Sequence, residues 1–212
     1  GSGETRVFAD QSYTGTTTVS GGTTLSVTTV TFTGPVVFAA DSRLNVAAYT
    51  AGVVPLSASA LTLPAEGTVG LTYNGGAFPV GVYAICSATD VTEVDGAKFA
   101  PSTGGETASW KVVGDRLILT VGTVADNYWT ELARDGDKMS TTGNWADGTA
   151  PADGEDVDFS SVTVTTTIDA DIANVTFGAV TMGSGAVVFA NDNMTATSFS
   201  DLEKVAVAEN ST

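Results

Sequence analysis

Short blocks that resemble one another recur along this chain, and their spacing is the feature that most constrains its fold. Residues 7–10, 37–41 and 188–191 each begin Val-Phe-Ala, and residues 157–160 are a looser relative. The steps from Val7 to Val37 and from Val157 to Val188 differ by a single position. Similarity at a fixed period of this size is the signature of a repeat architecture. The spacing therefore predicts coils of about 30 residues.

A second kind of block follows the first at a similar offset. Residues 25–32, 56–63 and 175–182 alternate apolar and small polar side chains, and residues 205–207 begin the same pattern. Alternation with a period of two is typical of β-strands. Each repeat thus holds at least two strands separated by Gly, Asn or Asp turns, which indicates a β-solenoid whose neighbouring coils stack and share a core.

The period also continues when the C-terminus of one copy is placed before the N-terminus of another. The step from Val188 to the next Val7 then equals the step from Val157 to Val188. The Gly-Ser-Gly of residues 1–3 falls within one residue of where residues 183–185 stand inside the chain. We therefore expect residues 157–212 of one copy to stack on residues 1–67 of the next, either by assembly of separate copies or within a longer tandem array.

Composition limits the possible functions. The chain has 212 residues, a net charge of −16, no histidine and one cysteine. The acidic balance argues against nucleic acid and anionic membranes as partners. The missing histidine excludes Ser-His-Asp and Cys-His catalysis and the usual zinc sites. The single Cys86 lies in a strand-like run, where we expect a small buried apolar residue.

The chain divides into four regions. Residues 1–67 and 157–212 carry the solenoid coils. Residues 68–122 interrupt the repeat and include Gly114-Asp115 between two apolar runs, which is a hairpin signal, so we expect an antiparallel β cap there. Residues 123–156 form a loop-rich region with Trp, Gly and Asp, which we call the Trp loop.

Three segments resemble a known family. The Trp loop resembles the opening of bacterial passenger regions that carry autotransporter-associated β-strand repeats, residues 13–25 resemble the repeat itself, and residues 114–121 resemble its end. The residues of the Trp loop and of the strand after it that carry the resemblance are Trp129, Gly136, Asp137, Asn144, Trp145, Gly148, Pro151 and 154–159. The resemblance implies an extracellular parallel β-helix with surface or adhesive roles.

Carboxylates gather in and after the Trp loop, at Asp135, Asp137, Asp153, Glu155, Asp156 and Asp158. Calcium binds several oxygens on a flexible loop, but the EF-hand spacing is not met because Met139 stands where a ligand is needed. We expect a solvated loop rather than a calcium site. Asp169 and Asp171 alternate onto one strand face and are the candidate pair for a polysaccharide-cleaving enzyme, although no basic residue accompanies them.

Three tryptophans, Trp110, Trp129 and Trp145, are candidates for stacking on sugars. Tryptophan near glycine-rich turns more often forms a local core that fixes loops. The two interpretations stay open at this point.

The sequence therefore predicts an all-β chain, a right-handed parallel β-helix with an antiparallel capping region; two β-sandwich-like domains are the alternative. The predicted function is that of an extracellular or cell-surface structural protein that associates head-to-tail with copies of itself. A glycan-binding adhesin segment is the alternative. We expect no enzyme activity, no catalytic, cofactor or metal site, and no partner among nucleic acids or membranes.

Overall fold

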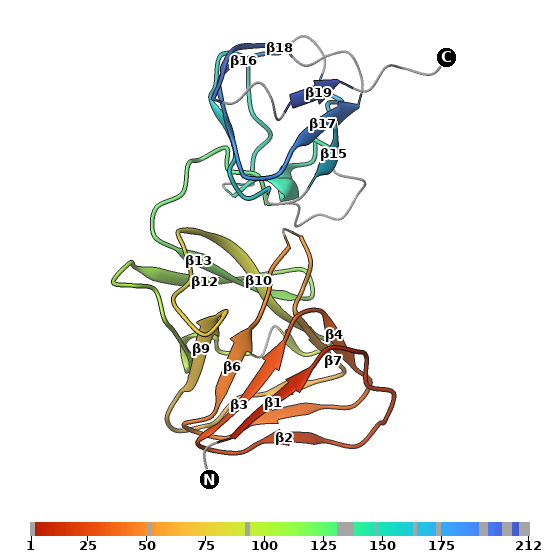
Figure 1. Cartoon of the computed structure of the whole chain (residues 1–212), viewed down its shortest axis with the longest axis vertical. Helices are drawn as coiled ribbons and strands as arrows, with labels where there is room; N and C mark the ends of the chain where they lie inside the picture. The colour runs from red at the N-terminus through yellow and green to blue at the C-terminus, as the bar shows by residue number, and fades with distance from the viewer. Residues whose placement is uncertain are drawn as a thin grey trace. The chain divides into compact units, whose positions relative to one another are not determined.

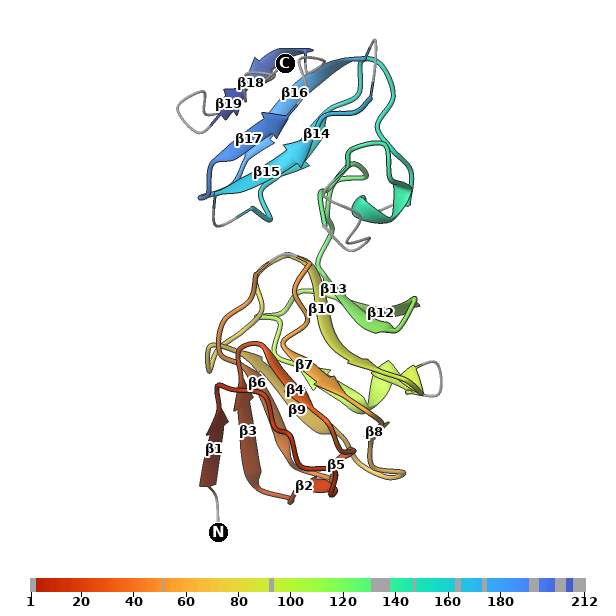
Figure 2. The same cartoon turned by 90° about the vertical axis from the view of Figure 1, so that its right-hand side faces the viewer.

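The fold is a β-solenoid built from short strands, as seen in a computed structural model of the chain (Figures 1 and 2). The structure describes residues 3–50, 52–91, 94–130, 138–146, 148–162, 165–172, 175–190, 195–200 and 205–207. It divides into two compact units, the first comprising 1–49 and 53–123 and the second comprising 50–52 and 124–212. No helix among the described residues is long and apolar enough to cross a membrane.

Unit 1 stacks its coils through three sheets. In Figure 1, β1, β3, β6 and β9 lie side by side in chain order. The first sheet is β1 (Gly3–Val7), β3 (Thr23–Val27), β6 (Arg43–Val46), β9 (Val69–Tyr73) and β11 (Phe99–Pro101), all parallel. The second is β2 (Thr17–Val19), β5 (Val36–Phe38) and β8 (Leu61–Thr62), also parallel. The third begins with β4 (Val30–Phe32) and β7 (Leu56–Ala58) and continues to β10 (Gly81–Ala88).

The third sheet ends in the antiparallel strands that the sequence predicts. Strand β13 (Arg116–Val121) pairs antiparallel with both β10 and β12 (Ala108–Val113). The predicted hairpin is confirmed, since Val113 lies opposite Arg116 and Gly114 adopts a φ of 59°. The antiparallel region is smaller than the predicted 68–122, because β9 and β11 within this range continue the parallel first sheet.

Unit 2 repeats the parallel arrangement with two sheets. Strands β14 (Val157–Phe159), β16 (Thr176–Met182) and β18 (Thr195–Phe199) form one, and β15 (Thr166–Asp169), β17 (Val187–Ala190) and β19 (Val205–Val207) form the other. Short 3-10 helices stand at η2 (Gly96–Lys98) in unit 1 and η3 (Thr142–Asn144) in unit 2.

Apolar side chains at equivalent positions stack on one another and form the core of each unit. Leu25 stands opposite Leu44, which stands opposite Leu71, and all three are buried. Burial of each such side chain stabilises the fold by roughly 1.5–3 kcal/mol. Because the stacked residues come from successive coils, the coils hold one another in register.

The coils do not have one fixed length. Thr5 lies opposite Leu25, and Leu25 lies opposite Leu44, so these coils take about 20 residues. Leu44 lies opposite Leu71 and Leu56 opposite Cys86, so later coils are close to the predicted length of about 30 residues. The step from Val7 to Val37 is therefore about one and a half coils, and it leads to another face, because Val7 belongs to β1 of the first sheet and Val37 to β5 of the second. The two residues are therefore not stacked on each other, although each coil holds at least two strands, as predicted.

Candidate functional site

The chain itself covers the first coil of unit 2 and extends one sheet of unit 1, whose other two sheets end in β11 and β8. In unit 1, the antiparallel strands β13 and β12 follow β10 on the side of the last coil. In unit 2, the Trp loop covers the first coil: Tyr128 forms a parallel bridge with Asp158, and Lys138 forms one with Asp169. The Trp129 N–H donates to the Asp158 carbonyl at 2.8 Å. These segments satisfy backbone groups that the first and last coils would otherwise expose.

The tryptophans of the Trp loop form a core and do not line a ligand site. Trp129 is 0% exposed and Trp145 is 2% exposed, and their rings meet edge-to-face with centroids 5.0 Å apart. The Trp145 Nε1–H donates to the Met139 carbonyl at 2.8 Å, and both rings pack near Phe159. Neither ring offers a surface to a sugar, which removes the candidate residues that the glycan-binding alternative used. Gly136 and Asp137 lie outside the described residues.

The opposite ends of the units carry strands with an unpaired edge. Strands β1 and β2 stand at the outer edge of their sheets in unit 1, and β18 and β19 do so in unit 2, within the part of the chain that the structure describes. Phe8 and Tyr13, between β1 and β2, are 61% and 47% exposed, which is unusual for large apolar side chains. We call β1 and β2 with these two residues the leading end, and β18 with β19 the trailing end.

A small hollow opens at the leading end. It has a volume of about 80 Å³ and is lined by Thr5, Thr17, Thr18, Val19, Thr23, Thr24 and Leu25. Thr5 and Thr17 stand in the first coil, whereas the coil that follows places Leu25 and Val36 opposite them. The first coil is thus less completely filled than the coils behind it.

A polar ladder runs along the first sheet to the leading end, and the sequence reasoning missed it. The Asn45 amide donates to the Ser26 hydroxyl at 2.9 Å, the Ser26 hydroxyl donates to the Glu4 carboxylate at 2.5 Å, and the Thr72 hydroxyl donates to the Asn45 carbonyl oxygen at 3.0 Å. The sequence pattern that could have predicted this ladder is a polar residue between two apolar residues, at 25–27, 44–46 and 71–73. The Ser26 hydrogen bond, and then the ion pair with Arg6, hold the pKa of Glu4 below its ordinary value.

Where carboxylates of the predicted acidic cluster are described, they accept backbone hydrogen bonds. Asp153 accepts from the Thr176 N–H at 2.8 Å, and Asp156 accepts from the Ala179 N–H at 2.7 Å, in each case from the following coil. The cluster therefore links coils. No group of three or more possible metal ligands is found among the described residues.

Two other carboxylates of the cluster accept hydrogen bonds from nearby backbone groups. Glu155 accepts from the Ala152 N–H, and Asp158 accepts from the Ser160 N–H. Asp135 and Asp137 lie outside the described residues.

The candidate catalytic pair, Asp169 and Asp171, does not share one strand face as predicted. Asp169 ends β15, whereas Asp171 lies beyond the strand and accepts hydrogen bonds from the N–H and hydroxyl of Ser140 at 2.8 and 2.5 Å. Asp171 thus holds the Trp loop against the first coil of unit 2. Cys86 is buried as predicted, and burial raises the pKa of its thiol to about 12.

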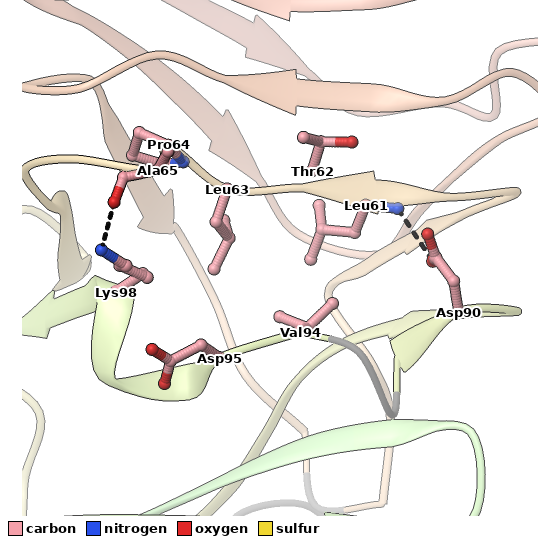
Figure 3. A pocket seen from close by; sticks show the side chains of 9 residues that line it. All are labelled: Leu61, Thr62, Leu63, Pro64, Ala65, Asp90, Val94, Asp95 and Lys98. Atoms are coloured by element: carbon pink, nitrogen blue, oxygen red, sulfur yellow. Dashed lines mark hydrogen bonds between the residues drawn. The ribbon is translucent and has the colours of Figure 1, made fainter.

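A groove of about 330 Å³ lies along β8 in unit 1 (Figure 3). The side chains of Leu61, Leu63 and Val94 point toward one another across it. At one end the Asp90 carboxylate accepts from the Leu61 N–H at 3.1 Å, and at the other the Lys98 ammonium donates to the Ala65 carbonyl at 2.7 Å. Charged side chains at a strand edge hinder the addition of another strand, so the edge of β8 is protected.

A second hollow, of about 290 Å³, lies beside the remaining candidate, Trp110. Its lining includes Val94, Asp95 and Lys111, and the indole ring is partly exposed and stacks on Phe99 with centroids 5.7 Å apart. Trp110 is the tryptophan of the three that borders a hollow open to solvent.

No protein family, no curated protein and no solved structure matches this chain. The resemblance to autotransporter-associated repeats therefore stays a prediction.

Proposed function

We propose that this chain is a non-enzymatic structural protein, at the cell surface or outside the cell, that joins copies of itself head-to-tail through its solenoid ends. The trailing end of one copy would stack on the leading end of the next. Such a contact is heterologous, because it joins two different surfaces, and it can extend into a filament or array.

The observation that carries this proposal is the asymmetry of the two units. The Trp loop covers the first coil of unit 2, and β13 and β12 extend the third sheet of unit 1, whereas β1, β2, β18 and β19 are outermost strands among the described residues. The two edges are complementary, because the trailing end is the last coil of one unit and the leading end is the first coil of the other. Placed together, they would continue the order of the coils. Strand addition across such edges satisfies backbone groups and supplies much of the binding free energy.

Side chains at the leading end support the same proposal. Phe8 and Tyr13 expose large apolar surfaces that a second copy would cover. At the other end of the second sheet, Asp90 and Lys98 already hold backbone groups beside β8.

Sedimentation velocity over a range of concentrations tests the proposal. The full chain is expected to form concentration-dependent oligomers, whereas a chain without residues 187–212, which lacks β17, β18 and β19, is expected to stay monomeric. Oligomers of the truncated chain equal to those of the full chain would contradict the proposal.

Glycan binding is the second candidate, and the hollow beside Trp110 is the observation that favours it. An indole face with a carboxylate and an ammonium group nearby can stack on a sugar ring and bond its hydroxyls. A glycan array with the full chain and a Trp110→Ala variant tests this function. Binding lost in the variant would support it, and an array without signals for the full chain would remove it.

A further inference from the structure

The spacing between two ladders agrees within one residue in one coil of each unit. Inside unit 1, Val27 in the first sheet is nine residues before Val36 in the second. Inside unit 2, Phe177 in β16 is ten residues before Val187 in β17. All four side chains are buried core residues. The pair in unit 1 can thus be compared with the pair in unit 2.

The same spacing occurs at both open ends. At the leading end, Val7 lies opposite Val27 and is ten residues before Thr17, which lies opposite Val36. At the trailing end, Ala196 lies opposite Phe177 and is nine residues before Val205, which lies opposite Val187. The two ends thus present matching pairs of positions, although they belong to different units.

We infer that the joint has a defined register, with Ala196 of one copy opposite Val7 of the next, Val205 opposite Thr17 and Val207 opposite Val19. The inference rests on the proposed head-to-tail function and names the residues that would carry it. Strand β19 then pairs in parallel with β2, three residues on three, and β18 pairs with β1.

The phase of the core positions agrees with this register. Val205 and Val207 stand opposite Val187 and Phe189, which are both 0% exposed, so they occupy the register positions of two core residues. On β2, Val19 is buried and stands opposite Phe38. A shift by one residue would bring inward positions onto outward ones along the whole strand. The register also places β19 over the hollow at the leading end.

The backbone of β2 agrees as well. The Thr17 N–H donates to the Pro35 carbonyl at 2.8 Å, and the Val19 carbonyl accepts from the Ala39 N–H at 2.9 Å. Because backbone groups alternate sides along a strand, the N–H and C=O of Thr18 point away from β5, toward the open edge.

On the trailing end, the Ala186 and Ala190 carbonyls accept from the Thr166 and Ala170 N–H groups at 2.9 Å each. The backbone groups of Val187 and Phe189 therefore face β19, and the parallel ladder places the groups of Val205 and Val207 at the open edge. In the inferred register, the Thr18 N–H meets the Val205 carbonyl and the Thr18 carbonyl meets the Val207 N–H. The alternation of inward and outward side chains and the alternation of backbone hydrogen-bonding groups thus select the same pairing of β19 with β2.

Disulfide trapping tests the register. An Ala206→Cys protein is mixed with a Thr18→Cys protein under mild oxidation, since these residues would lie opposite each other on strands about 4.8 Å apart, within the range that a disulfide spans. Thr16→Cys and Ser20→Cys are the matched controls, because all three positions on the leading end are exposed and the controls shift the register by two residues. The buried Cys86 provides an inert background.

The expected result is efficient cross-linking of position 206 to position 18 on a non-reducing gel, at least tenfold faster than to positions 16 or 20. A Thr195→Cys protein with an Arg6→Cys protein gives a second, independent pair on β18 and β1. If the copies associate in sedimentation but cross-link best to position 16 or 20, the register is overturned while the proposed function stands. If neither pair cross-links and the protein sediments as a monomer, both are overturned.

Discussion

Thr18→Pro is expected to block association while leaving the solenoid folded. Thr18 lies on the unpaired edge of β2, with its N–H directed away from β5, so proline removes no hydrogen bond to the neighbouring strand. Proline is tolerated on edge strands for this reason. At the inferred joint, the same change removes the hydrogen bond to Val205 and places the proline ring where the incoming carbonyl must lie.

The magnitude follows from these two losses. One backbone hydrogen bond contributes about 1 kcal/mol net, and an unsatisfied carbonyl with a steric clash costs about 1–2 kcal/mol more. The dissociation constant is therefore expected to rise roughly 30- to 150-fold for a total of about 2–3 kcal/mol. Sedimentation velocity measures the association, and circular dichroism measures the thermal unfolding, which is expected to stay within a few degrees of the original.

Thr18→Ala is the matched control, because it changes the exposed side chain and keeps the N–H. It is expected to associate as the original protein does. If Thr18→Pro associates with unchanged affinity while it remains folded, β2 is not part of the joint and the reasoning is refuted.

Four further experiments test the packing of the chain. Trp129→Ala should lower the free energy of unfolding of unit 2 by about 3–5 kcal/mol, as for a large buried aromatic, and urea unfolding should then show unit 2 melting before unit 1. Asp156→Ala should cost about 1–2 kcal/mol by leaving the Ala179 N–H without its acceptor, whereas Asp156→Asn, which keeps an acceptor oxygen, should restore most of this in the same urea assay. Gly183→Ala should cost about 2–4 kcal/mol, because its new methyl group would collide with carbonyls of the preceding coil; a thermal midpoint equal to the original would contradict that close approach. With a thiol pKa of about 12, only about 0.01% of Cys86 is ionised at pH 8, so a thiol reagent should label it only after denaturant unfolds the chain, and rapid labelling of the native protein would disprove its burial.

The pKa of Cys86 also predicts a trend at alkaline pH. The folded-state value is raised, so the unfolded chain loses its thiol proton first as the pH rises above the ordinary value of 9.0. The folded state should therefore lose stability between about pH 9 and pH 12 and gain nothing from this group at lower pH. Urea unfolding of a Cys86→Ala variant across this range isolates the contribution.

The strands and the solenoid could be predicted from sequence, because alternation of apolar and small polar residues dictates which side chains face a shared core. The number of residues in each coil could not be predicted from sequence. The blocks at Val7 and Val37 look alike since strands on different faces of the coil use the same alternation, and local similarity does not distinguish one coil from one and a half. The registers of Thr5, Leu25 and Leu44 resolve this.

The candidate site was predictable only in outline. The repeats predicted that the C-terminal coils of one copy stack on the N-terminal coils of the next. They did not predict which strands lie at the edges of the sheets, because that depends on where the Trp loop and the antiparallel strands pack. The tryptophans of the Trp loop illustrate the limit: Trp129 and Trp145 stand among glycines and carboxylates, a pattern that favours a local core but also fits a sugar platform. Only packing on Phe159 shows that they are core.

Negative-stain electron microscopy of the purified full chain at neutral pH tests the central claim most directly. Long thin filaments, shortened or lost in Thr18→Pro, are the result that this account predicts. Monodisperse single particles at every concentration, for the original protein as for the variant, would contradict it.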